Sequence, residues 1–201
     1  MSRSLRWLLP ALVAVAVALP CSAQGASRLS PTAARVLADG QMTVKVGDGE
    51  AIYRSTIVYT PADGSYVRTT TDAAGAVIET ERLETPMIRP TADEEAAVQA
   101  LIAADPELSA LIAEASARTG REVMVSGGFP LVREAGHPCD ATARCVQYDI
   151  FSPRVTGPRG ADRVRYVIVD LRTLSIVSRD FNPATDANLA NPAYRDESRS
   201  R

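Results

Sequence analysis

Two cysteines and the single histidine of this chain stand close together in its second half. Cys139 and Cys145 are separated by five residues, and His137 lies two residues before the first of them. A thiolate beside an imidazole could act as a nucleophile, but one histidine supplies too few ligands for a zinc site. In an oxidising compartment such a cysteine pair forms a disulfide. We therefore predict this crosslink and place His137 in a surface loop.

Two aspartates lie within strongly apolar runs and could act as acids. Asp149 is in the run that ends at Phe151, and Asp170 follows Tyr166-Val167-Ile168-Val169. A buried carboxylate needs an arginine or backbone donors, so we predict paired structural carboxylates, with acid catalysis as the alternative. The sequence has no Gly-x-Ser-x-Gly elbow, P-loop, dinucleotide fingerprint, HExxH or calcium loop. It predicts no metal and no cofactor.

A group of arginines follows the first of these apolar runs. Only Asp162 opposes the four side chains, which are Arg154, Arg159, Arg163 and Arg165. Guanidinium groups bind phosphates and carboxylates through paired hydrogen bonds, so the group could hold an anionic partner. The alternative is a solvated hairpin loop, because charged loops are common on soluble surfaces.

The N-terminus has the pattern of an export signal. Arg3 and Arg6 precede an apolar run from Leu8 to Leu19, and Cys21-Ser22-Ala23 offers small residues for cleavage after Ala23. Two prolines leave the run too short for the roughly 20 residues of a membrane span. Residues 1–23 are therefore predicted to be a signal peptide, with a lipoprotein acylated on Cys21 as the alternative.

Composition narrows the classes of partner. The chain has 22 Lys and Arg against 24 Asp and Glu, and the predicted signal removes two of the basic residues. The mature chain is thus acidic, which argues against general binding to nucleic acid or to an anionic membrane. Abundant Ala and Arg with a single lysine, Lys45, suggest a bacterial envelope or secreted protein.

The residues after the signal are expected to form a linker and then strands. Residues 24–40 are small and polar and predict a linker. Residues 41–84 alternate with period two between turn signals, which include Gly47-Asp48-Gly49 and Ala62-Asp63-Gly64. This pattern predicts an antiparallel β-meander of four strands.

Residues 85–182 are expected to form an α+β domain. Thr91 and Glu94 form a capping box, Asp105-Pro106 starts a second helix, and Gly120 ends it. Four strands follow, the first crossing Gly127-Gly128 as a bulge. The predicted fold class is α+β, with two consecutive helices covering an antiparallel sheet that the meander precedes. The meander could extend this sheet or form its own small domain, and residues 183–201 are predicted to be a flexible tail.

The second half of the chain resembles the PepSY-like family of exported domains. The resemblance lies in the Thr-x-x-Glu helix start at Thr91 and in the hairpin Val167-Ile168-Val169-Asp170-Leu171-Arg172-Thr173-Leu174-Ser175-Ile176-Val177. Leu174 stands where the turn of that family usually has glycine, and the loop from Cys139 to Cys145 is an insertion. The resemblance implies a helix packed on an antiparallel sheet and a binding or protease-inhibiting module without a catalytic residue set.

These observations favour a binding protein over an enzyme. We expect an exported, periplasmic or secreted accessory protein that binds a protein or peptide partner, with no transmembrane segment after signal cleavage. A small periplasmic hydrolase that uses Asp149 or Asp170 is the first alternative, and a structural envelope component is the second.

Overall fold

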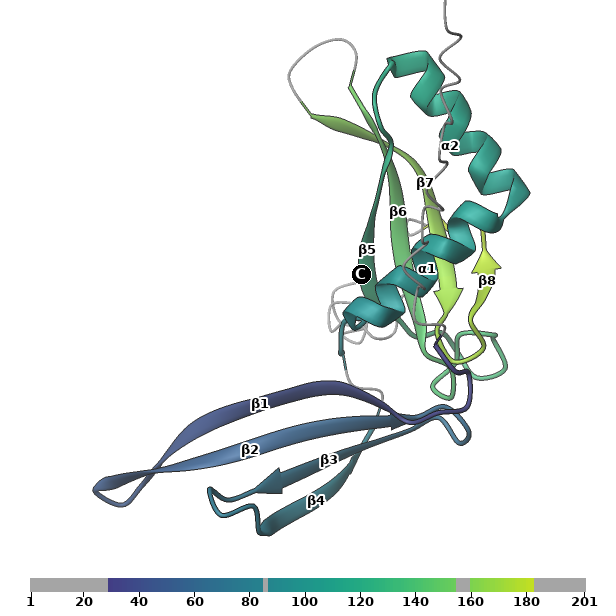
Figure 1. Ribbon diagram of the computed structural model, residues 1–201. Coiled ribbons are helices and arrows are strands. Elements are labelled where there is room, and N and C mark those ends of the chain that lie inside the picture. The colour runs from purple at the N-terminus through teal and green to yellow at the C-terminus, as the bar shows by residue number, and fades with distance from the viewer. Residues whose placement is uncertain (1–28, 85–86, 155–159, 183–201) are drawn as a thin grey trace, which may run out of the picture.

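The computed structural model describes residues 29–84, 87–154 and 160–182. The predicted signal peptide with Cys21, the predicted tail and Arg159 lie outside the described residues. The described chain forms two antiparallel four-stranded sheets and two helices, which confirms the mixed α+β class. Figure 1 shows the helices on one face of the second sheet, while the first sheet projects from one end of this body.

The first sheet is a meander with strand order β1-β2-β3-β4. Its strands are β1 Arg35–Val46, β2 Gly49–Thr60, β3 Ser65–Thr71 and β4 Val77–Leu83. The strand β1 begins within the predicted linker, because its pairing with β2 continues to Arg35 opposite Tyr59. A bulge between Val36 and Ala38 buries Leu37 against Tyr59 and interrupts the alternation that would have indicated a strand there.

Two consecutive helices follow as the capping signals predict. The helix α1 spans Ala92–Ala104 and starts at the capping box of Thr91 and Glu94. The helix α2 spans Pro106–Thr119, is capped by Asp105, and is bent by 85° from α1. Within the described residues, neither helix alone is long and apolar enough to cross a membrane, and only the bent pair together reaches that length and composition.

The second sheet carries the main core, with strand order β5-β6-β7-β8. Its strands are β5 Met124–Leu131, β6 Cys145–Pro153, β7 Ala161–Asp170 and β8 Ser175–Ser178. The bulge predicted in β5 is present, and Gly127 is required there because a Cβ would lie 2.6 Å from the Gln147 carbonyl oxygen. Fully buried side chains of the two helices pack on fully buried side chains of β6 and β7. The helices contribute Val98, Ile102 and Leu108, and the strands contribute Val146, Ile150, Val167 and Val169.

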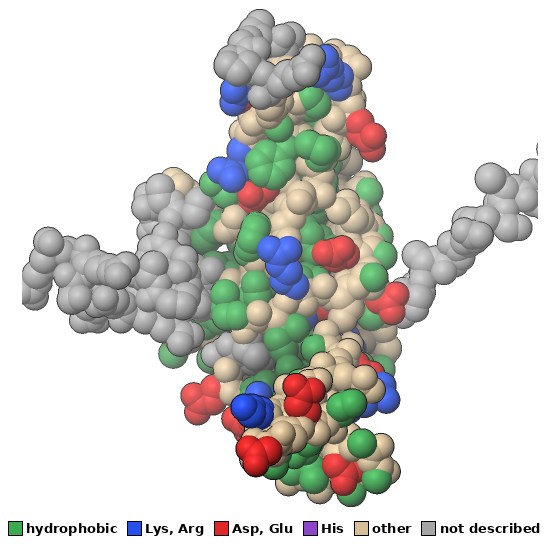
Figure 2. Space-filling model, turned by 90° about the vertical axis from the view of Figure 1, so that its left-hand side faces the viewer, with side chains coloured by type: hydrophobic (Ala, Val, Ile, Leu, Met, Phe, Trp, Pro, Cys, Tyr) green, Lys and Arg blue, Asp and Glu red, His purple; other side chains and the backbone are tan. Residues whose placement is uncertain are grey.

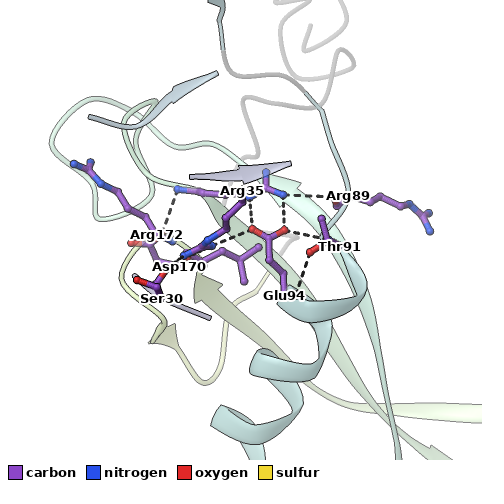
Figure 3. A network of polar contacts seen from close by, with 9 residues as sticks. Ser30, Arg35, Arg89, Thr91, Glu94, Asp170 and Arg172 are labelled. Atoms are coloured by element: carbon purple, nitrogen blue, oxygen red, sulfur yellow. Dashed lines mark hydrogen bonds and ion pairs between the residues drawn. The ribbon is translucent and has the colours of Figure 1, made fainter. Parts of the chain in front are cut away.

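The two sheets are separate, so the meander does not extend the second sheet. Glu94, which is fully buried, joins them through two arginines (Figure 3). Its carboxylate accepts hydrogen bonds from Arg144 Nε at 3.0 Å and Nη2 at 2.8 Å, and from Arg35 Nη1 at 3.1 Å. The Arg144 guanidinium also lies 5.5 Å from the ring centre of Tyr59. This cluster fixes β1 and β2 to the start of α1.

Candidate functional site

The predicted disulfide between Cys139 and Cys145 is present. The two Cα atoms are 5.5 Å apart, and both side chains are buried against Leu131 and Ile168. The Nδ1 atom of His137 accepts a hydrogen bond from the Cys139 backbone N–H at 2.9 Å. The histidine is half-buried within this turn and contributes to its structure. The described residues contain no group of three His, Cys, Asp or Glu side chains that could hold a metal.

Asp149 is a buried side chain with partners on both oxygens. It accepts hydrogen bonds from Gln147 Nε2 at 2.9 Å and from Arg163 Nε at 3.2 Å. The Arg163 guanidinium also stacks on Tyr166, 4.3 Å from its ring centre. This is the paired arrangement that a buried carboxylate requires.

Asp170 is buried at the opposite end of the sheet, where β7 turns into β8. It accepts hydrogen bonds from the backbone N–H groups of Arg144 and Arg172 at 3.2 and 2.9 Å, and from Thr173 Oγ1 at 2.9 Å. The ladder places Asp170 opposite Cys145 and Asp149 opposite Tyr166. Asp149 and Asp170 are therefore four residues apart along the sheet and do not form a carboxylate pair.

Two of the predicted binding arginines, Arg154 and Arg163, line a cleft of about 770 Å³. The cleft is at the end of the body away from the meander. The cleft lies between the end of α2 and the hairpin of β6 and β7, and Figure 2 shows basic side chains, which are arginines, at this upper end of the molecule. Its lining residues are Arg118, Thr119, Ser152, Pro153, Arg154, Asp162, Arg163 and Val164.

The arginines of the cleft differ in their pairing. Arg154 binds Asp162, with its Nη2 atom 2.7 Å from Oδ1, and Arg163 binds Asp149. Arg118 is in the last turn of α2, where a cation offsets the negative end of the helix dipole. It has no ion-pair or hydrogen-bond partner within the part of the chain that the structure describes. Among the described residues, these three guanidinium groups exceed the two carboxylates that they contact, so the cleft favours an anion.

Ser152 supplies a buried hydroxyl at the wall of this cleft. The residue is 3% exposed, and its Oγ atom has no hydrogen-bond partner among the described residues. A buried polar group without a partner costs free energy, on the order of 1–3 kcal/mol. The hydroxyl oxygen exposes almost no surface, so a ligand in the cleft would accept its hydrogen bond, and remove this cost, only after the atoms that cover it move.

The sequence did not indicate Arg118 or Ser152 as site residues. Along β6, Ser152 falls on the same alternating positions as Tyr148 and Ile150, which face the helices. The period-two pattern could therefore have predicted that Ser152 faces the helices as well. Arg118 is on a helix that is distant in sequence, and only the packing of α2 on the sheet brings it to the cleft. Arg165 lies outside the cleft and contacts Glu107, with Nη1 3.5 Å from Oε1.

Comparisons with known proteins leave the family open. No protein-family model and no curated protein matches this chain. Among solved structures, it is similar to a copper-containing benzylamine oxidase from Hansenula polymorpha, with a TM-score of 0.42 and 14% sequence identity. The match covers 69% of this chain and 22% of the oxidase chain. At this level the similarity assigns no activity and no metal to the protein.

Proposed function

We propose that this chain is an exported bacterial accessory protein that binds a protein or peptide partner without catalysing a reaction. The cleft of Arg118, Ser152, Arg154 and Arg163 receives an acidic side chain or carboxylate of that partner. The observation that carries this proposal is a cleft in which the described guanidinium groups outnumber the carboxylates, lined by Ser152, whose buried hydroxyl has no partner among the described residues.

The geometry supports binding of a carboxylate in particular. A carboxylate has two acceptor oxygens, so it can accept from a guanidinium and, once the atoms that cover Ser152 have moved, from its hydroxyl at the same time. Arg154 and Arg163 are each held by an aspartate, which orients their remaining N–H groups. Because these side chains are already ordered, less conformational entropy is lost when the partner binds.

The surroundings of Ser152 support binding rather than covalent catalysis. A nucleophilic serine needs a general base within hydrogen-bond reach. Among the described residues, the Ser152 hydroxyl has no such partner, and His137 is bound in the disulfide turn. An exported location is supported by the disulfide, because such bonds persist in oxidising compartments. The PepSY-like assignment is part of the proposal and is supported by the helix start and final hairpin.

A peptide-binding experiment tests this function. A fluorescein-labelled glutamate-rich peptide is titrated with the purified protein, and anisotropy gives the Kd. We expect Arg118→Gln and Ser152→Ala each to weaken binding about ten-fold, the loss of one hydrogen bond to a charged group. Because the buried Ser152 hydroxyl has no partner among the described residues, its removal should not lower the free energy of unfolding and should raise it by relieving the unpaired group, so weaker binding would not result from misfolding.

The matched control is Arg82→Gln, which removes one positive charge from an exposed position on β4 of the first sheet, away from the cleft. It leaves the Kd unchanged if the cleft is the site. Equal affinities for the wild type, Arg118→Gln and Ser152→Ala contradict the proposal. Equal weakening by Arg82→Gln also contradicts it, because the peptide is then attracted by overall charge.

A further inference from the structure

We infer that the outer edge of β1 pairs with the β1 of a second copy of this chain, antiparallel and about a two-fold axis at Met42. The surface is separate from the cleft and does not depend on it. The partner is identified by the shape of the edge, by its apolar face and by the positions of two opposite charges.

The strand β1 offers a long open edge. It is the first strand of its sheet, and no described strand pairs with its outer side. From Ala38 to Val46 every residue is exposed. Figure 1 shows the hairpin of β1 and β2 projecting away from the helices, so the outer half of the edge is clear of the body. An unpaired edge of this length is a template for strand addition.

The same part of β1 carries an apolar row on one face. Met42, Val44 and Val46 are 41%, 40% and 54% exposed. They lie opposite Tyr53, Ala51 and Gly49 of β2, so this face continues onto the neighbouring strand. Side chains of one face in adjacent strands contact each other, and a second copy would cover the row with its own.

The hairpin determines which residues can bond across the edge. Gly47 has φ 59°, and the two-residue turn of Gly47 and Asp48 is closed by the pair of Val46 and Gly49. In an antiparallel ladder, alternate residues direct their N–H and C=O groups to the same side. Val46, Val44 and Met42 therefore bond to β2, and the outward groups belong to Lys45, Thr43, Gln41 and Asp39.

One antiparallel register matches opposite charges. When the two-fold axis passes through Met42, Asp39 of each copy lies opposite Lys45 of the other, and Gln41 lies opposite Thr43. A two-fold axis at Gln41 instead places Asp39 opposite Thr43, and an axis at Thr43 places Lys45 opposite Gln41. Asp39 already binds Arg54 and remains partly exposed, so it can also accept from a lysine. The Met42 register is thus the one that pairs charge with charge.

Cysteine crosslinking tests the register. At the two-fold axis the Cα atoms of the two Met42 residues are about 4.5 Å apart, within the range of a disulfide. Under mild oxidation, Met42→Cys should convert to a covalent dimer on non-reducing gels. Val44→Cys is the matched control, since Val44 is equally exposed but lies two residues from the axis. Its two copies are about 13 Å apart and stay uncrosslinked.

Charge-reversal substitutions test the pairing of Asp39 with Lys45 in solution. Light scattering of the wild type should give twice the mass of one chain. Asp39→Lys and Lys45→Asp each oppose like charges twice, and each variant should be a monomer. Mixed in equal amounts they should form a heterodimer, because every facing pair is then opposite in sign. A monomeric wild type, equal crosslinking of Met42→Cys and Val44→Cys, or no association of the mixture would overturn the inference.

Discussion

At the scale of the residue, Leu174 has an unusual backbone. It is the one non-glycine residue with positive φ in the described chain, at 54°, and it lies in the turn between β7 and β8. An L-residue in this left-handed region costs roughly 1–2 kcal/mol because its Cβ approaches the following carbonyl oxygen. The PepSY-like resemblance places a glycine at this position, where it would remove that cost.

Replacing Leu174 tests this strain. In most positions alanine is more stable than glycine, but here we expect Leu174→Gly to be more stable than Leu174→Ala by about 1 kcal/mol. Both variants lose the leucine side chain, so their difference reports the backbone. Urea unfolding followed by circular dichroism measures it. An alanine variant that is the more stable of the two would show that the turn relaxes without strain.

At the scale of the element, the start of α1 combines two roles. The Thr91 hydroxyl accepts from the Glu94 backbone N–H at 3.3 Å, while the Glu94 carboxylate accepts from the Thr91 backbone N–H at 3.0 Å. The same carboxylate binds Arg35 and Arg144. The cap therefore positions both the helix and the buried charge.

Substitution of Thr91 measures how much its hydroxyl contributes to the stability of the helix cap. We expect Thr91→Ala to lower the free energy of unfolding by about 1 kcal/mol, because the Glu94 backbone N–H loses its acceptor. Thr91→Ser keeps the hydroxyl and should lie close to the wild type in the same urea titration. If serine and alanine destabilise equally, the methyl group of Thr91 matters and its hydroxyl does not.

At the scale of the whole molecule, two groups of contacts hold the sheets together. Glu94 of α1 binds Arg35 of β1, and Arg172, in the turn between β7 and β8, donates to the carbonyl oxygens of Pro61 and Ala62 at 2.8 and 3.2 Å. Burial alone would raise the pKa of Glu94, but hydrogen bonds and charge from Arg144, with further bonds from Thr91 and Arg35, lower it below its ordinary value. The ionised form is therefore the one that the fold stabilises.

This shift gives a pH dependence with a definite sign. Because the pKa of Glu94 is lower in the folded state, its contribution is complete above the unfolded-state pKa of about 4.5 and is lost as pH falls through the folded-state value. Glu94→Gln leaves two buried guanidinium groups without their anion and should cost about 3 kcal/mol at neutral pH.

Urea titrations at several pH values measure this contribution. The stability difference between the wild type and Glu94→Gln should narrow as the solution is acidified below about pH 4. Arg68→Gln is a control that breaks an exposed ion pair on the first sheet and should cost far less. A difference that does not vary with pH would show that Glu94 is not ionised in the folded protein.

The sequence by itself determined the features that depend on neighbouring residues. The meander strands, both helix starts, the bulge at Gly127 and the disulfide follow from local periodicity, capping and a short loop, and all are present. The early start of β1 was missed because the bulge at Leu37 breaks the local period. The features that were predicted correctly depend only on residues close together in the sequence.

Only the tertiary structure decided how distant parts meet. It separated the two sheets, buried Glu94 between Arg35 and Arg144, and brought Arg118 of α2 to Ser152, Arg154 and Arg163. Arg165, two residues after Arg163, was directed to Glu107 instead. The physical reason is that each of these contacts depends on the packing of helices on the sheet and of one sheet against the other, which local patterns do not encode.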